Sequence, residues 1–452
     1  MTAIKSFKQG KKELSHLSKD EKKLLPLLIE AVKKVDKIFE LQENDKYEGA
    51  AFYPTDVKRA NIEAAAKNDN KIFSPFTIVE VDSFGNITAV DYHVKYASLL
   101  KPICSLLKKA AGLSKNKSFK NYLETLANSL INGDYQKMDI AWLNVEGSNL
   151  DVVIGPYERN LDKLFFIKKA YQGHVGIIDK ELTKKGKSIR DIIYTTIGSR
   201  PHRVIPPSVV DVRAEKNIVS AGFLGRLFFT QQHLPSDADT TERYGSRIIG
   251  YLSSIDYKFD NLIYPIFNKI FEKNFKARYP KELLRTGNYY YVLLRGLAQQ
   301  LHRYQDSRAR LKELFPIYDE ANSSVSGVQH AKHLVLKGVL CQKELEAIMV
   351  CQICWIFSEW VIAREEKSRE SYLKGDSLAL NFLISENALK ENNGISWPNF
   401  AKMFFELENL SVIFARFLES GTYIEAQEFL SKYLSYEPFK AFERSLSTIK
   451  PL

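Results

Sequence analysis

Apolar residues recur at helical spacing along several long segments of the chain. Between residues 22 and 41 they fall on one face of a helix, at Leu24, Leu25, Leu28, Ile29, Val32 and Val35. The same spacing predicts helices at 94–111 and 119–131, and nearly every segment after residue 257 follows it. The C-terminal part of the chain is therefore expected to be helical.

Alternating apolar and polar residues predict a smaller β-rich part. A hairpin is expected at 74–90, where Phe84-Gly85-Asn86 separates two alternating runs. Further strands are expected at 140–145, 150–154, 173–178 and 223–230, and prolines indicate an irregular connection at 201–212. The pattern predicts an α+β fold that is predominantly helical, with a mixed α/β part before a helical part.

Length and composition fit a large globular protein. Of the 452 residues, 45% are hydrophobic and 12% aromatic, which is enough for two or three lobes and too apolar for a disordered chain. We divide the chain into a basic N-terminal segment and helix at 1–44, a mixed α/β lobe at 45–256 and a helical lobe at 257–452.

The net charge and the cysteine content indicate which binding partners and which cellular compartment to expect. The formal net charge is +11, and the segment from Lys101 to Lys120 is rich in lysine and has no acid. Because no nucleic-acid-binding motif accompanies this segment, a solvated basic face is favoured over contact with nucleic acid or an anionic membrane. The four cysteines are too few for a disulfide framework and indicate a reducing compartment.

No targeting or membrane-spanning segment is recognisable. The N-terminus lacks the apolar core of a signal peptide, and no apolar run approaches the roughly 20 residues that span a bilayer. We therefore expect a cytoplasmic protein without a transmembrane segment. Export by a route that uses no signal peptide is also compatible with the sequence.

An ordered series of short motifs runs through the chain. Its members are Phe52-Tyr53-Pro54-Thr55-Asp56, Asp139-Ile140-Ala141-Trp142-Leu143, Gly155-Pro156-Tyr157-Glu158, Asp162-Lys163-Leu164-Phe165, His233-Leu234-Pro235-Ser236-Asp237 and Leu311-Lys312-Glu313-Leu314. Over roughly residues 45–435 this series resembles the bacterial zinc hydrolases similar to dipeptidyl peptidase III. The resemblance implies a two-lobed scaffold, with a mixed α/β lobe and a helical lobe flanking a cleft.

The zinc site that this resemblance implies is degenerate. The family carries a His-Glu-x-x-His helix, in which two histidines bind zinc and the glutamate is the general base. Here Arg295 and Gln299 stand at the histidine positions and Gly296 at the base. A register shifted by one residue gives Leu294, Arg295 and Ala298, which also lacks an imidazole and a base.

The third zinc ligand of the family comes from a second helix. In that helix Glu320 falls on the ligand position, and Ser324 falls on the acidic position that orients a ligand histidine in the family. A lone carboxylate in a closed cleft is costly, so we predict that Arg295 pairs with Glu320.

The resemblance also implies positions that hold a peptide. Tyr157 and Glu158 retain the family pattern, although their Gly-Pro turn is also a structural motif. Ser236 and Ser253 replace asparagines that hold the peptide backbone in the family. These four residues are the candidate substrate-binding positions.

One other metal site is conceivable from residue spacing. His330 with His333 and Cys351 with Cys354 form two pairs at i, i+3 spacing. The spacing between the pairs matches no zinc finger, and thiols in an apolar helix are ordinary core residues. A core role is favoured.

The leading hypothesis is a catalytically inactive relative of dipeptidyl peptidase III. It would be a binding or regulatory module that takes a peptide or protein segment in its cleft, with no cofactor and without the zinc of the family. Two alternatives remain: an active peptidase or hydrolase with a rebuilt site, and a basic protein that contacts nucleic acid or an anionic membrane. Enzyme activity is left open and no oligomeric state is assigned.

Overall fold

A computed structural model describes residues 5–6, 14–159, 161–197, 210–226, 228–301, 304, 306–366, 369–391, 395–396 and 398–452. The chain divides into two compact units, which are described one at a time. The first contains Met1–Thr183 and Arg213–Ser253, and the second contains Lys184–Val212 and Ser254–Leu452. The first is mixed α/β and the second mainly helical, so the predicted fold class is confirmed.

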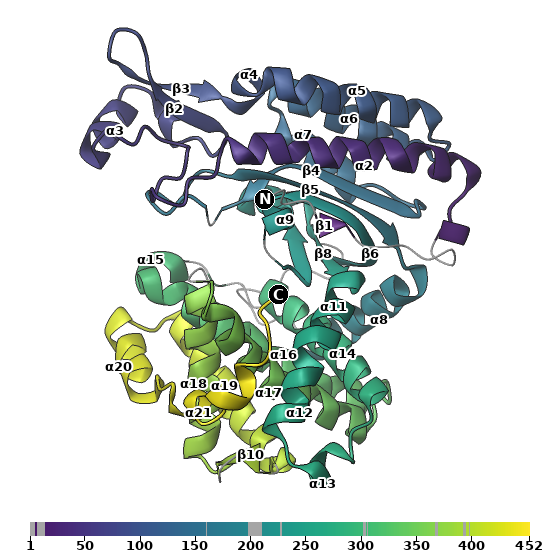
Figure 1. Ribbon diagram of the computed structural model, residues 1–452, viewed down its shortest axis with the longest axis vertical. Coiled ribbons are helices and arrows are strands. Elements are labelled where there is room, and N and C mark those ends of the chain that lie inside the picture. The colour runs from purple at the N-terminus through teal and green to yellow at the C-terminus, as the bar shows by residue number, and fades with distance from the viewer. Residues whose placement is uncertain are drawn as a thin grey trace. The chain divides into compact units, whose positions relative to one another are not determined.

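A curled sheet forms the centre of the first unit (Figure 1). Its strands, in spatial order, are β4 (Leu150–Glu158), β5 (Ala170–Ile178), β6 (Val210–Gly222), β8 (Ser246–Tyr251) and β7 (Gln231–Leu234), and β1 (Lys5–Ser6) pairs with β6. In the β4–β5 register Val153 lies opposite His174 and Asp151 opposite Gly176. Paired residues point to the same face, so alternate residues of the two strands build one polar and one apolar face.

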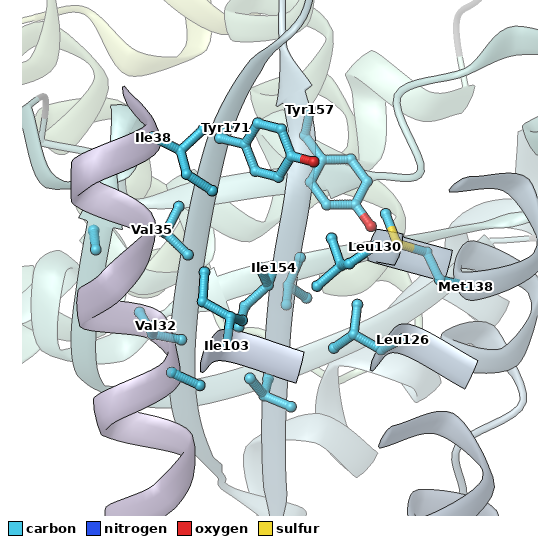
Figure 2. Close-up of a cluster of buried hydrophobic side chains, with 14 of the residues drawn as sticks. Val32, Val35, Ile38, Ile103, Leu126, Leu130, Met138, Ile154, Tyr157 and Tyr171 are labelled. Atoms are coloured by element: carbon cyan, nitrogen blue, oxygen red, sulfur yellow. The ribbon is translucent and has the colours of Figure 1, made fainter. Parts of the chain in front are cut away.

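Three helices cover the apolar face of this sheet. They are α2 (Lys19–Glu40), α5 (Ala97–Leu113) and α6 (Lys117–Asn132), which lie side by side in Figure 1. The helix α2 begins at a capping box formed by Ser18 and Glu21. Figure 2 shows its Val32 and Val35 packed toward the strands, together with Ile103 of α5 and Leu126 of α6. The helical periodicity read from the sequence therefore forms the core of this unit.

Smaller elements complete the first unit. The predicted hairpin is present as β2 (Thr77–Val81) and β3 (Ile87–Asp91), which pair in antiparallel register. Around it lie α3 (Arg59–Ala66), α4 (Tyr92–Lys95) and α7 (Tyr135–Leu143), and α10 (Ala238–Tyr244) precedes β8.

Two predicted strands are wrong. The segment 140–145 belongs mostly to the helix α7, because Tyr135, Met138, Asp139 and Trp142 repeat at helical spacing and are buried. The segment 223–230 begins with the short helix α9 (Phe223–Arg226) rather than a strand. Short apolar runs do not distinguish a strand from a buried helix, which explains both errors. Of the predicted irregular connection at 201–212, residues 201–209 lie outside the described residues, and Val210–Val212 begin β6.

The second unit is built from long helices. Its core is made by α14 (Lys281–Leu301), α16 (Phe315–Leu336), α17 (Gln342–Ala363) and α18 (Glu370–Ser385), which contact one another. Around them lie α8 (Lys180–Ile197), α11 (Leu252–Lys258), α12 (Tyr264–Ile270), α13 (Lys273–Lys276), α15 (Ser307–Leu311), α19 (Phe400–Glu419), α20 (Tyr423–Tyr433), α21 (Glu437–Lys440) and α22 (Glu443–Leu446), with the strands β9 (Lys390–Glu391) and β10 (Ile395–Ser396). In the described part of the chain, α17 alone is long and apolar enough to span a bilayer. Of its most apolar window, 89% is buried inside the protein.

Two glycines let the core helices approach closely. A Cβ atom on Gly327 of α16 would lie 2.8 Å from the backbone nitrogen of Arg295 in α14. A Cβ atom on Gly375 of α18 would lie 2.7 Å from the carbonyl oxygen of Ile317 in α16. Any larger side chain would separate the helices, so these glycines hold α14 and α18 against α16.

Candidate functional site

Arg295 and Glu320 form an ion pair between α14 and α16. The Arg295 Nη2 donates to the Glu320 Oε2 at 2.6 Å, and the two side chains are only 13% and 16% exposed. Burial by itself would lower the pKa of Arg295, but the adjacent Glu320 carboxylate raises it above its ordinary value. The ion pair predicted from the sequence is therefore present.

The other positions that the resemblance aligns with the zinc-binding helices lie within the packing of the second unit. Gly296 is buried in α14, and Gln299 is half-buried one turn further along. Ser324, at the position of the family's acidic residue, lies 2.8 Å from the Tyr291 hydroxyl. The Gln352 amide also approaches the Ser324 hydroxyl at 3.4 Å. Ser324 thus belongs to a polar contact between core helices.

A second set of buried charged side chains lies near this pair and was not predicted from the sequence. It consists of Arg369, Lys258 and Glu359, and we call it the second layer. The Arg369 Nε and Nη2 donate to Glu359 at 2.9 and 2.7 Å. The Lys258 ammonium lies 3.5 Å from the other oxygen of Glu359 and 3.5 Å from the centre of the Trp355 ring. Glu359 is a lone acid in the apolar part of α17. Because a buried charge must be paired, this acid was the feature of the sequence that could have indicated the second layer.

Tyr372 connects the two layers. Its ring lies 3.7 Å from the Arg369 Cζ and 5.8 Å from the Arg295 Cζ, so both guanidinium groups lie against one aromatic ring. The nearby Glu320 carboxylate, followed by burial, raises the pKa of the Tyr372 hydroxyl. The hydroxyl therefore keeps its proton at neutral pH.

The acids of this cluster differ in protonation because their surroundings differ. Burial would raise the pKa of Glu359, but Arg369 and Lys258 lower it to about 2. Burial raises the pKa of Asp376 to about 7, although Arg295 opposes the shift. Burial lowers the pKa of Lys258 to about 8, against the opposing effect of Glu359. Glu359 is thus the permanent anion of the second layer.

This donor set does not fit a catalytic zinc ion. Such an ion needs three protein ligands and an open position for water. At the positions implied by the resemblance, Glu320 alone offers a ligand of the usual kind, and its Oε2 already accepts from Arg295. A guanidinium stays protonated and repels a cation, so Arg295 supplies the positive charge that a metal would bring.

The candidate peptide-binding residues all lie in the first unit. The Tyr157 hydroxyl donates to Asp139 at 2.7 Å, and the Ser236 hydroxyl donates to the carbonyl oxygen of Tyr157 at 3.1 Å. Glu158 is buried at the end of β4, and the preceding Gly155 and Pro156 pair within this strand, so the turn expected at these two residues is wrong. Ser253 lies elsewhere, with its hydroxyl 3.4 Å from the carbonyl oxygen of Asn217. The structure therefore brings Tyr157 and Ser236 together and places Ser253 on another partner.

A buried polar cluster on the sheet was also missed by sequence reasoning. Asp151, His174 and Glu215 come from β4, β5 and β6, and one ligand atom of each lies within 4.8 Å of the others. Among the described residues this is the one group of three or more His, Cys, Asp or Glu side chains with that geometry. The feature of the sequence that could have indicated this cluster is the presence of polar residues in strands that are otherwise apolar.

One acid of this cluster is paired with an arginine. Asp151 accepts from Arg213 at 2.7 Å and from the Trp142 indole at 2.8 Å. Burial raises the pKa of Glu215 well above its ordinary value, and burial lowers the pKa of His174 to about 4. Asp151 and Arg213 then carry opposite charges, and burial favours the neutral forms of Glu215 and His174.

The alternative histidine and cysteine site is not assembled in the described part of the chain. Cys351 and Cys354 are buried in α17, and the Cys351 thiol lies 3.2 Å from the carbonyl oxygen of Leu284. The His330 and His333 rings are 6.5 Å apart. No group of these four side chains approaches metal-ligand geometry among the described residues. The cysteines act as core residues.

Comparisons with known proteins place the fold. No protein-family profile matches the sequence. The chain is 24% identical over 426 residues to Nudix hydrolase 3 of Arabidopsis thaliana. That match covers 91% of this chain and 54% of the plant protein, so the chain spans about half the length of this relative.

Solved structures of dipeptidyl peptidase III are similar along the whole chain. The enzyme from Caldithrix abyssi superposes with a TM-score of 0.87 at 22% identity, over 99% of this chain and 95% of that chain. The enzyme from Corallococcus sp. strain EGB gives a TM-score of 0.82 at 20% identity, over 99% and 93%. The chain therefore has the dipeptidyl peptidase III fold, and the resemblance predicted from its motifs is confirmed.

Proposed function

We propose that this chain is a catalytically inactive dipeptidyl peptidase III-like protein that binds a peptide or protein segment without cleaving it. The observation that carries the proposal is the Arg295–Glu320 ion pair at 2.6 Å. It places a fixed guanidinium against the one carboxylate that the family pattern retains. Zinc hydrolysis needs a metal-bound water and a general base, and neither Arg295 nor Gly296 can supply them.

The surroundings of the pair support a stable replacement rather than a vacant metal site. Arg295 and Glu320 are mostly buried, and Gly327 brings the backbones of α14 and α16 into contact at Arg295. A guanidinium satisfies the Glu320 carboxylate through charge-assisted hydrogen bonding, as a cation would. The pair thus removes the electrostatic reason for Glu320 to recruit zinc.

Binding without cleavage fits the remaining anchor positions. Tyr157 is held by Asp139, and Ser236 contacts the backbone of Tyr157. Ser236 and Ser253 offer short hydroxyl side chains where the resemblance implies the longer amide side chains of asparagine. We expect weaker and less precise positioning of a peptide, which suits recognition better than catalysis. The four free cysteines, three of them buried, support a reducing compartment such as the cytoplasm.

The test is an assay of dipeptide release from a dipeptidyl arylamide, with the purified chain supplemented with zinc. We expect no release above that of buffer with zinc alone. The matched control is the Glu320→Gln variant, which removes the retained carboxylate and leaves Arg295 in place. Release that a chelator stops, and that Glu320→Gln abolishes, would contradict the proposal and favour an active enzyme with a rebuilt site.

A further inference from the structure

Two arginines converge on one aromatic ring in the second unit with hydrogen-bond donors to spare. Arg295 lies on α14, and Arg369 lies next to the start of α18. Their guanidinium carbons are 5.8 and 3.7 Å from the centre of the Tyr372 ring. Residues far apart in the sequence are thus held against the same ring.

Neither guanidinium is saturated by the described residues. Arg295 has five N–H donors, and its one hydrogen bond within the described part of the chain goes to Glu320. Arg369 donates through Nε and Nη2, both to the same oxygen of Glu359. Each arginine therefore has N–H groups that donate no hydrogen bond to the described residues.

The two side chains also retain contact with solvent. The Arg295 side chain is 13% exposed and the Arg369 side chain is 17% exposed. Their acid partners differ, because Glu320 is 16% exposed and Glu359 only 1%. Glu359 is thus closed off from solvent, whereas the side chains of both arginines and of Glu320 each keep a small exposed fraction.

We infer that Arg295 and Arg369, backed by Tyr372, form a receptor for the C-terminal carboxylate of a bound peptide. The inference rests on the proposed function and names the group that this site recognises. A carboxylate is planar and accepts two parallel hydrogen bonds, which matches the free edge of a guanidinium. The aromatic ring restricts both arginines, so little side-chain entropy is lost when the anion binds.

The charges around the ring favour this ligand over a neutral one. Lys258 and Arg369 both face Glu359, so two cations share one carboxylate in the second layer. Lys258 is 4% exposed and does not reach solvent as the arginines do. Three cations, Arg295, Arg369 and Lys258, thus face two carboxylates, Glu320 and Glu359, which leaves an excess of positive charge among these ion pairs.

The probe is N-acetyl-trialanine with a free carboxylate, compared with the same peptide carrying a C-terminal amide. Binding is measured by ligand-observed NMR titration at constant ionic strength. We expect the free carboxylate to bind about tenfold or more tightly than the amide, because charge-assisted hydrogen bonds are replaced by weaker ones. The wild-type chain alone gives this result, so it does not depend on how a variant folds.

Three variants locate the effect. Arg295→Lys and Arg369→Lys keep the charge but lose the planar fork, and each should reduce the preference for the carboxylate to about threefold or less. The matched control is Arg285→Lys, since Arg285 also pairs with acids, at Asp260 and Asp256, and lies 4.7 Å from the Phe259 ring. This control should leave the preference unchanged. Thermal unfolding of each variant shows that the comparison is made on folded protein.

Other outcomes overturn the inference. Equal affinity for the acid and the amide refutes it and leaves the proposed function intact. No binding of either peptide refutes it and also removes the peptide-binding part of the proposed function. Binding of inorganic phosphate with no binding of the peptide acid would assign the site to a different oxyanion. Cleavage of the peptide would contradict the proposed function rather than the recognition of the carboxylate.

Discussion

The guanidinium of Arg295 donates to the carboxylate of Glu320 across 2.6 Å, with both side chains mostly buried between α14 and α16. The motif resemblance aligns Glu320 with a zinc ligand of the resembled hydrolases and Arg295 with one of their histidines. In this pair the guanidinium balances the charge of the Glu320 carboxylate.

Removing one partner of this pair should destabilise the protein. Arg295→Ala should lower the free energy of unfolding by about 3 kcal/mol, because it strands the Glu320 carboxylate in a mostly buried position. Replacing both partners by methionine should cost clearly less. Urea unfolding of the two variants measures the difference. The control is Arg285→Ala at a more exposed pair, which should cost about 1 kcal/mol or less.

Restoring the metal positions should recover zinc binding more completely than peptidase activity. The triple variant Arg295→His, Gly296→Glu and Gln299→His joins two imidazoles and a base to the retained Glu320. Ser324 contacts Tyr291 and cannot orient a ligand histidine as an acid would. Zinc affinity and dipeptide release are measured on the same preparation. Normal turnover would show that the peptide anchors are intact, and absence of zinc binding would show that another register is correct.

Protonation of Asp139 should make stability depend on pH. Burial raises the pKa of Asp139 to about 7 from an ordinary value of 3.8. The folded state then holds a proton that the unfolded state releases, so the contribution of Asp139 to stability falls as pH rises from about 4 to about 7. The slope is at most about 1.4 kcal/mol per pH unit.

The comparison that isolates this effect is between the wild type and Asp139→Asn. Unfolding free energies are measured at several pH values between about 4 and 8. The wild-type curve should fall relative to that of Asp139→Asn across this window, and exposed Asp45→Asn should leave the wild-type slope unchanged. Parallel curves for the wild type and Asp139→Asn would mean that Asp139 is ionised throughout.

The buried cluster on the sheet makes a separate prediction. Glu215→Gln should change the stability by about 1 kcal/mol or less at neutral pH, because the raised pKa of Glu215 keeps it uncharged. Asp151→Asn should cost about 3 kcal/mol or more, since it leaves the Arg213 guanidinium buried without a charge partner. Chemical denaturation of both variants measures these changes in the free energy of unfolding. A large cost for Glu215→Gln would show that Glu215 is ionised or holds a cation.

The periodicity of apolar residues predicted most of the fold. In a long amphipathic helix, the helical repeat and the burial of one face produce the same spacing of apolar residues. The helix α2 and the hairpin of β2 and β3 follow their sequence patterns closely. The segment 140–145 was misread because its apolar run is short, and burial of Met138 and Trp142 on one helical face decides its state. The hairpin and α2 were predicted correctly because clear alternation or a long helical period supports each of them, and the segment 140–145 has neither.

The candidate site could be predicted only in part. Arg295 and Glu320 were found because a motif places them in register on two helices. Arg369 and Lys258 join Glu359 from separate elements, and no spacing in the sequence encodes their meeting. The same holds for Asp151 and Glu215, which tertiary pairing of strands brings together. Local sequence identified single positions, and the packing of elements determined their partners.

Zinc content tests the central claim most directly. The purified chain is loaded with excess zinc, dialysed against a weak chelator and assayed by elemental analysis beside its Glu320→Gln variant. The ion pair between Arg295 and Glu320 predicts far less than one zinc per chain in both proteins. About one zinc per chain in the wild type, lost in Glu320→Gln, would show that Glu320 still serves a metal and would contradict the account.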